Sequence, residues 1–262
     1  MAKNAVATYL ALYIYAEIYQ VIFTVIILYT KNIYHLISYL IFLCAMAVYS
    51  GIQFYELKNT LFFGLLYSSW ERFCKAFSII VIVLSCIVCL VQAVNVWKMR
   101  IQFLKATGEK VSNNPKLIRA DIIFNLHRNA LIIAAFFFPA FTLQFAVIVL
   151  DKTDPEFVIT IVILGLSYLV LILADYCAAR KYSWGLYAVL LAYMGAMSYL
   201  AFKIYRMFTW YSMIPGRRSL IAFDIFCIIL LIWMSLLTVL VKWNFNSLKR
   251  VNRQESDDND DI

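Results

Sequence analysis

Glu17 is an acidic residue within a long apolar run that extends from Ala5 to Tyr29. Tyr13 and Gln20 lie about one helical turn on either side of it, so a helix would place all three on one face. A carboxyl group in hydrocarbon either hydrogen-bonds to a neighbouring helix or takes part in moving a proton or a substrate. We favour the hydrogen bond between helices, because no second carboxyl group occurs at a matching depth.

A second candidate site combines one carboxyl group with two cations in the C-terminal part of the chain. Asp224 lies about one helical turn inside the last apolar run, and Lys203 and Arg206 close the run before it. Because consecutive helices are antiparallel, the end of one and the start of the next lie at the same membrane face, and these residues would be neighbours there. A buried charge is tolerated when it is paired, so we expect Asp224 to bind the two cations in a structural clamp. The alternative is an anion-binding site that uses the same cations.

Two further features concern contacts between helices. Ala188, Ala192 and Ala196 recur every four residues, with Gly195 beside them, so a neighbouring backbone can approach this helix face closely. Gln144 is a polar side chain within another apolar run, and we expect it to hydrogen-bond to a facing helix. Both features indicate how helices pack and are not specific for any one function.

Known catalytic and metal-binding patterns are absent from the sequence. The two histidines, His35 and His127, are not spaced with other metal ligands. The sequence contains no GxSxG turn, phosphate-binding loop, dinucleotide fingerprint or HExxH helix. We therefore expect no catalytic residues, no metal, no cofactor and no enzymatic activity. An intramembrane enzyme with an unfamiliar motif is the remaining alternative.

Composition indicates which elements carry these residues. Hydrophobic residues make up 64% of the 262 residues and charged residues 15%, whereas soluble domains have about 45–50% and about 25%. The apolar residues occur in runs of about 20, long enough to cross a bilayer as helices, and they do not alternate as barrel strands would. The sequence predicts an all-α bundle of about seven transmembrane helices, over residues 5–29, 33–55, 76–97, 130–150, 157–179, 184–204 and 220–241.

We interpret residues 1–250 as one transmembrane domain and residues 251–262 as a tail of different character. The tail is acidic and offers little apolar surface to bury, so we expect it to be disordered. Its sequence Glu255-Ser256-Asp257 has the acid-x-acid spacing of signals for transport out of the endoplasmic reticulum. Lys and Arg are more frequent in the connections on the C-terminal side of the membrane, which predicts a lumenal or external N-terminus and a cytosolic C-terminus.

The longest predicted connection, residues 98–129, is also the most basic. After Pro115 it spaces Ile118, Ile122 and Leu126 one helical turn apart among basic residues. This pattern fits a helix lying on an anionic cytosolic leaflet, and it fits a solvated helix within the loop equally well.

Short motifs occur in most of the apolar runs. They are Tyr19-Gln20, Tyr49 with Gln53, Leu143-Gln144-Phe145, Glu156-Phe157, Phe202-Lys203-Ile204-Tyr205-Arg206, Ala222-Phe223-Asp224 and Asn244-Phe245-Asn246. In these motifs the chain resembles the uncharacterised multi-pass Golgi-apparatus membrane proteins of fungi, whereas residues 98–129 depart from the pattern of that family. The resemblance implies a seven-helix protein of the Golgi or a neighbouring endomembrane, and it carries over no established activity.

Three functional hypotheses fit the sequence. The first is a non-enzymatic endomembrane protein that acts by binding, as a scaffold, trafficking factor or accessory subunit of a membrane complex. The second is a transporter or lipid-handling protein that uses Glu17 and the Lys203, Arg206 and Asp224 group, and the third is a seven-helix receptor. Membrane lipids and other membrane-protein subunits are the expected partners. The net charge of +8 fits loops that meet anionic lipid, and nucleic acid is not expected as a partner.

Overall fold

Seven α-helices make up the described part of the chain, and no β-strand occurs in it. The computed structural model describes residues 2–62, 68–108, 115–150, 155–209 and 217–260. The helices are α1 (Ala2–Thr30), α2 (Ile33–Phe62), α3 (Ser68–Gly108), α4 (Pro115–Ile148), α5 (Pro155–Ala179), α6 (Ser183–Thr209) and α7 (Arg217–Asp260). Each contains a stretch that is long and apolar enough to cross a membrane. The predicted all-α fold with seven spans is therefore confirmed.

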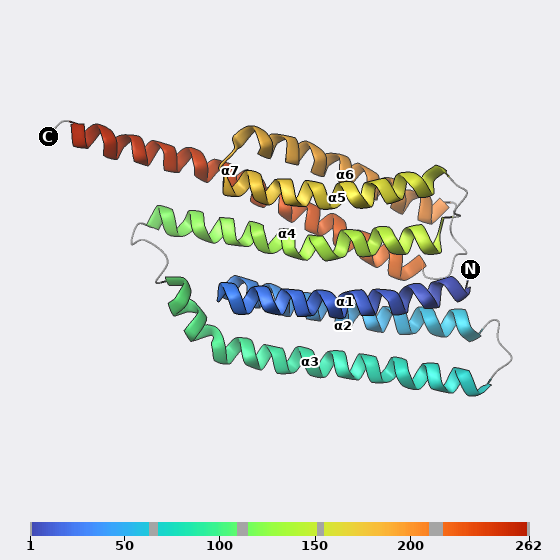
Figure 1. Cartoon of the computed structure of the whole chain (residues 1–262). Coiled ribbons are helices and arrows are strands. Elements are labelled where there is room, and N and C mark those ends of the chain that lie inside the picture. The colour runs from blue at the N-terminus through green and yellow to red at the C-terminus, as the bar shows by residue number, and fades with distance from the viewer. Residues whose placement is uncertain (1, 63–67, 109–114, 151–154, 210–216, 261–262) are drawn as a thin grey trace.

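The helices run side by side, and the two termini lie at opposite ends of the bundle (Figure 1). We name these ends the N-terminal face and the C-terminal face. α4 is the central helix, because it contacts α1, α2, α5 and α7 and its spanning part is the most buried of the seven. Within the described ranges α3 contacts only α2, and Figure 1 shows it at the margin, separated from α4–α7 by α1 and α2.

Aromatic rings fill the core between α1, α2 and α4. Phe136 of α4 is fully buried, and its ring centre lies 5.2 Å from that of Tyr19, 4.9 Å from that of Phe42 and 5.1 Å from that of Phe137. The Tyr19 hydroxyl also donates a hydrogen bond to the carbonyl oxygen of Ile132, which attaches α1 to α4. Such aromatic pairs contribute about 0.5–1.5 kcal/mol beyond the burial of their area.

A tight turn joins α5 to α6 on the C-terminal face. Lys181 has a left-handed backbone conformation (φ 55°), and the Tyr182 N–H donates to the Cys177 carbonyl oxygen at 2.9 Å. This is the usual geometry of a helix that ends with a left-handed residue. The two helices therefore run antiparallel, and the beginning of α5 lies beside the end of α6 on the N-terminal face.

The connection predicted over residues 98–129 is mostly helical. α3 extends well into it, and α4 begins at Pro115, a residue type favoured at the first position of a helix. Ile123 is buried in a cluster with Cys177 and Val241, so this segment packs on α5 and α7. The prediction of a separate helix on the membrane surface or in solvent is therefore wrong. A helix that packs on neighbouring helices shows the same spacing of apolar residues as a surface helix, so the pattern does not distinguish them.

α7 is longer than a membrane span, because 44 residues of helix extend about 66 Å. Its apolar part ends at Phe245, and the remainder projects beyond the other helices on the C-terminal face (Figure 1). The helix includes residues 251–260, for which the sequence predicts disorder, whereas residues 261–262 lie outside the described part. Extending an existing helix requires no new nucleation, and Arg253, Gln254 and Glu255 are good helix formers, so the helix can continue past residue 250.

Candidate functional site

An ion cluster lies at the N-terminal face, where α5 begins and α6 ends. Glu156 accepts hydrogen bonds from the Lys203 ammonium and the Arg206 guanidinium. The two cations are three positions apart on α6, so they lie on the same side of the helix. The Lys203 side chain is only 1% exposed, and its ammonium lies 3.9 Å from the centre of the Phe145 ring. The buried ammonium is therefore stabilised both by an anion and by an aromatic face.

Asp224 of α7 is fully buried, and neither of its carboxyl oxygens accepts a hydrogen bond from any described residue. Lys203 is near enough to interact with it electrostatically, but the ammonium bonds to Glu156. The structure thus corrects the predicted clamp, since the anion that binds Lys203 and Arg206 is Glu156. The long lysine side chain reaches outward to the first turn of α5, whereas Asp224 lies about 10 Å inside α7.

A buried polar contact joins α2 to α4 in the same region. The Gln144 amide donates to the Tyr49 hydroxyl at 2.5 Å, which confirms the predicted bond between helices. The Tyr49 ring packs edge-on against Phe223, the neighbour of Asp224 in the chain, and Gln53 is buried one turn further along α2. The amide oxygens of Gln53 and Gln144 accept no hydrogen bond from the described residues. Buried acceptor groups of α2, α4 and α7 thus gather in one region.

Several of the short motifs noted in the sequence meet at this place. Their residues here are Tyr49 and Gln53 on α2, Gln144 and Phe145 on α4, Glu156 on α5, Lys203 and Arg206 on α6, and Asp224 on α7. The motifs are far apart along the chain, yet they contribute to one region, which is buried except for the partly exposed Glu156 and Arg206. We call this region the N-face cluster.

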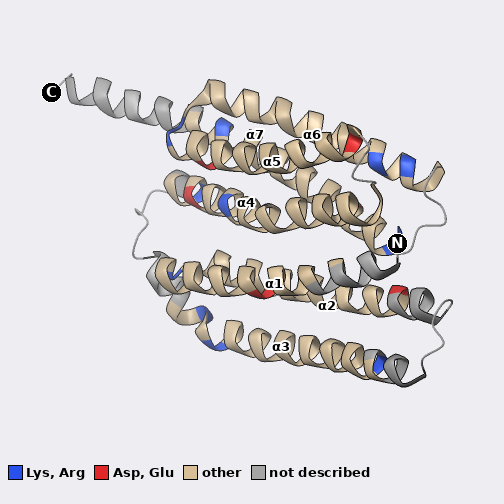
Figure 2. Cartoon of the chain, turned by 45° about the vertical axis from the view of Figure 1, so that its right-hand side comes forward, with Lys and Arg blue, Asp and Glu red and all other residues tan. Residues whose placement is uncertain are grey.

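Glu17 lies elsewhere, on the exposed side of α1. Its side chain is exposed and forms no hydrogen bond or ion pair with the residues that the structure describes, and Gln20 on the same helix face is half-buried. The hydrogen bond to another helix that the sequence predicts for Glu17 is thus not made within the described chain. The backbone of α1 comes close only to those of α2 and α4 among the described helices, and no described bond joins Glu17 to α7, so Glu17 and Asp224 do not form one site. Most of the charged positions coloured in Figure 2 lie near helix ends.

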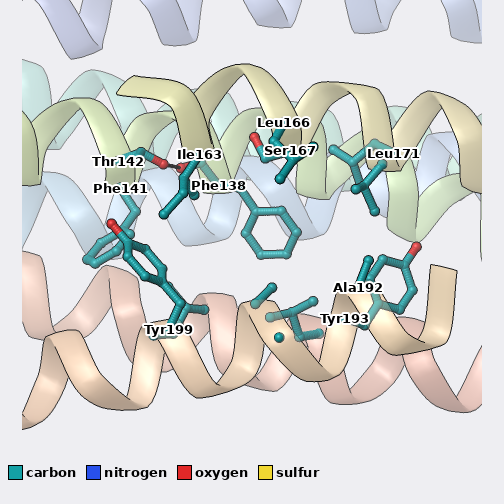
Figure 3. A pocket seen from close by; sticks show the side chains of 15 residues that line it. Phe138, Phe141, Thr142, Ile163, Leu166, Ser167, Leu171, Ala192, Tyr193 and Tyr199 are labelled. Atoms are coloured by element: carbon teal, nitrogen blue, oxygen red, sulfur yellow. Dashed lines mark hydrogen bonds between the residues drawn. The ribbon is translucent and has the colours of Figure 1, made fainter. Parts of the chain in front are cut away.

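A cavity of about 330 Å³ lies between α4, α5 and α6 and has an almost entirely apolar lining. Figure 3 shows the Phe138 ring reaching into it from α4. Ala192 and Ala196, together with Gly195, line the cavity from α6, and Ala188 is exposed. The close approach that the sequence predicts for this face is therefore not made there, because no atom lies within 4 Å of a Cβ placed on Gly195 and the small side chains leave space between the helices. The volume lies within the range of small-molecule sites, but few polar groups are present to orient a ligand.

Polar side chains form a second network at the C-terminal face, in which α4 bonds to three other helices and to the turn between α1 and α2. The pairs are Asn125 with Asn32, Asn129 with His35, His127 with Thr238, and Arg128 with Asp175. The bonds of Asn125, His127 and Asn129 are not predicted from the sequence, because residues 98–129 are interpreted there as a loop, whereas pairing of Asp175 with a cation of that loop is an expectation that the bond to Arg128 confirms. Four polar residues within five positions were the available signal, since a helix points them toward different neighbours.

No family model matches the chain, and no curated protein or solved structure matches it significantly. The fold itself defines the class, because the described part of the chain has seven helices of membrane-spanning length and composition. The protein is a multi-pass membrane protein. Its function is therefore inferred from the placement of its exposed and buried polar residues.

Proposed function

We propose that the protein acts by binding inside the membrane, as a non-enzymatic accessory subunit or scaffold of an endomembrane complex. The observation that carries this proposal is the exposed side chain of Glu17 within the membrane-spanning part of α1. A partner membrane protein that covers this face would supply the hydrogen-bond donor that the described residues of this chain do not supply.

The position of Glu17 makes contact with lipid unfavourable. It lies 12 positions, or about 18 Å along a helix, inside the apolar run that begins at Ala5. An acidic residue in the bilayer core costs about 2.5–3.5 kcal/mol on insertion scales, and such residues usually face protein or a water-filled cavity. Glu17 does not line the apolar cavity between α4, α5 and α6. A protein partner is the simplest way to remove this cost.

α3 offers a second face on which a partner helix could pack, because none of its described side chains is buried. Large apolar residues on it are strongly exposed, including Phe77 (65%), Leu90 (69%) and Trp97 (65%). α1 and α3 both contact α2, but they do not contact each other within the described ranges. Both helices therefore present open apolar faces to a transmembrane helix of a partner.

A photoreactive amino acid at Val21 tests the proposal in native membranes. Val21 is 64% exposed and lies one helical turn from Glu17. We expect it to yield a discrete cross-linked protein adduct. Leu191 on α6 is the matched control, because it is 76% exposed on a helix that α1 does not contact, and we expect lipid adducts only at this position.

Substitution of Glu17 separates a binding role from a structural one. Glu17→Leu should leave the amount of the chain in the membrane unchanged, because Glu17 makes no bond within the described chain. It should lower the Val21 adduct about tenfold, as expected for the loss of one hydrogen bond to a charged group. Glu17→Gln keeps a hydrogen-bonding side chain and should have a smaller effect. An equal loss of abundance and adduct, or no protein adduct at Val21, would contradict the proposal.

We assign the complex to the Golgi or a neighbouring endomembrane. The support is the resemblance in the short motifs and the acidic sequence Glu255-Ser256-Asp257. Imaging of the tagged chain beside organelle markers tests this assignment, and a signal confined to the plasma membrane would overturn it. Protease protection of tags at both ends tests the expected lumenal N-terminus and cytosolic C-terminus.

The N-face cluster favours a second candidate function, which is transport of a proton or a small cation. Asp224 is a fully buried carboxyl group whose oxygens accept no hydrogen bond from the described residues. Such groups mark ion pathways in membrane proteins. In this form the hypothesis does not include Glu17. Asp224→Asn should abolish cation flux into vesicles that contain the purified protein, at unchanged abundance, and equal flux would exclude this function.

A further inference from the structure

A groove of about 420 Å³ lies between α1 and α5 and opens toward the surrounding membrane. Leu131 and Ala135 of α4 form its floor, and Ile26 of α1 and Ile172 of α5 lie on opposite walls. The described backbones of α1 and α5 do not contact each other, so the space between them reaches down to α4. We call this feature the α1–α5 groove.

A pair of tyrosines closes the inner end of the α1–α5 groove. The hydroxyl groups of Tyr15 on α1 and Tyr168 on α5 lie 3.0 Å apart and share a hydrogen bond. The Tyr15 hydroxyl also lies 3.2 Å from the Ala135 carbonyl oxygen, to which it can donate. The tyrosine pair therefore limits how far a molecule can extend along the groove toward the N-terminal face.

The outer end of the α1–α5 groove is charged. Arg128 donates to Asp175 through Nε at 2.8 Å and through Nη2 at 3.2 Å. The two side chains are 48% and 37% exposed, so both remain accessible from the groove. Asp175 occupies only part of the N–H donors of the guanidinium, and Arg128 occupies only part of the acceptor capacity of the carboxylate. Both groups can therefore bind a further ion of opposite charge.

The charged and apolar groups of the groove follow the order of a lipid in one leaflet, with the charges nearest the C-terminal face. Asp175 lies about 6 Å from the end of α5 at Ala179, close to the C-terminal face, and Thr30 at the end of α1 lines the groove beside it. Tyr168 lies about 10 Å deeper along α5, and apolar side chains line the interval. The groove is thus polar at headgroup level and apolar below it.

We infer that the α1–α5 groove binds a zwitterionic glycerophospholipid with a phosphoethanolamine headgroup. The phosphate bonds to Arg128, as guanidinium groups bind phosphate well, and the primary ammonium donates to Asp175. The two charges of this headgroup are two carbon atoms apart, and the two protein charges are adjacent. A purely anionic headgroup would meet the Asp175 carboxylate without a compensating cation. The upper part of one acyl chain lies along the apolar interval as far as Tyr168.

This site is independent of the partner proposed above. Tyr15 and Glu17 are two positions apart on α1, so they point to nearly opposite sides of the helix. A lipid in the α1–α5 groove therefore leaves the Glu17 face open. Failure of one proposal has no bearing on the other.

Photolabelling of the full-length protein in vesicles tests the inference. The probes are phosphatidylethanolamine and phosphatidylglycerol with the same photoreactive acyl chain, each added in trace amounts to phosphatidylcholine vesicles. We expect phosphatidylethanolamine to label peptides of α1 and α5 about tenfold more than phosphatidylglycerol, as one additional charge-assisted hydrogen bond implies.

Two variants and a control locate the label in the groove. The double variant Arg128→Gln with Asp175→Asn removes both charges, and it should fold because a half-exposed ion pair adds little stability. Ala135→Phe fills the floor and leaves the charges in place. Both should reduce labelling by phosphatidylethanolamine about tenfold. Ala192→Phe, which instead fills the cavity between α4, α5 and α6, should leave labelling unchanged.

Three results would overturn the inference. Equal labelling by both probes would indicate an ordinary lipid-facing surface, and stronger labelling by phosphatidylglycerol would indicate an anionic lipid. Labelling that persists in both groove variants would place the lipid elsewhere. Loss of labelling in Ala192→Phe as well would show a general disturbance of packing in place of a site in the groove.

Discussion

α3 and α4 are both strongly apolar helices, but α4 is buried in the bundle and α3 lies exposed at its margin. The mean hydropathy of the spanning part is 2.8 in α3 and 2.3 in α4. In an 18-residue window of that part, however, 72% of the residues are buried in α4 and none in α3. In water, the more apolar helix would be expected in the core. In a bilayer, lipid tails are as apolar as leucine, so hydrophobicity alone does not decide which helix lies in the centre.

Polar side chains and close packing distinguish the two helices. The polar residues Asn129 and Gln144 of α4 bond to residues of α2. On α3, Gln92 and Asn95 bond to each other at 3.2 Å along the same helix. α4 therefore has polar groups that need neighbouring helices, whereas α3 satisfies these two within itself and can face lipid or a partner.

Truncation of one phenylalanine in each helix tests most directly whether α4 is packed more tightly than α3. Phe136→Ala should lower the free energy of unfolding by about 3–5 kcal/mol, because it opens a cavity among the rings that join α1, α2 and α4. Phe77→Ala on α3 is the matched control, and its 65% exposed ring should matter little. Unfolding in mixed detergent micelles measures both. Equal losses would mean that α3 is packed as tightly as α4.

The ion cluster at the N-terminal face allows a similar comparison between a bonded carboxyl group, Glu156, and one without a hydrogen bond from the described residues, Asp224. Glu156→Gln should lower the free energy of unfolding by about 3 kcal/mol, because it leaves the buried Lys203 ammonium without its anion. Asp224→Asn should cost less than about 1 kcal/mol, since no hydrogen bond to a described residue is lost. The same unfolding titration ranks the two variants. A larger effect of Asp224→Asn would restore the clamp that the sequence predicts.

Glutamines on the two helices give the smallest expected difference. Gln144→Leu should lower the free energy of unfolding by about 1 kcal/mol, because the bond to Tyr49 is lost in a fully buried place. Gln92→Leu on α3 should leave stability unchanged within error, since its bond to Asn95 lies on the half-exposed outer helix. A loss of similar size at Gln92 would indicate that α3 has a polar contact beyond α2, which crosslinking would then locate.

Much of the fold could be predicted because the apolar runs have the length of a bilayer span. Polar residues within an apolar run were harder to interpret, because the sequence of one helix does not show which helix packs against a given face. Gln144 was assigned correctly to a bond between helices, whereas the partner of Lys203 was not. Glu156 lies just before the predicted span of residues 157–179 and was noted only as part of a short motif, and no local pattern shows that the long Lys203 side chain reaches it.

Errors in the connection after α3 had a different cause. The chain from Pro115 to Asn129 is polar enough to resemble a loop, but its polar side chains meet partners on α2, α5 and α7. Because this segment was separated from α4, the bonds of Asn125, His127 and Asn129 on the C-terminal face were missed.

The sequence by itself determined that the chain crosses a membrane as seven helices, because backbone groups in hydrocarbon must bond within their own helix and apolar length sets each span. Only the tertiary structure decided which helix is central, which anion binds Lys203, and that Glu17 faces outward. These outcomes depend on contacts between side chains of different helices. The spacing of apolar residues along one helix does not specify which other helix lies beside it.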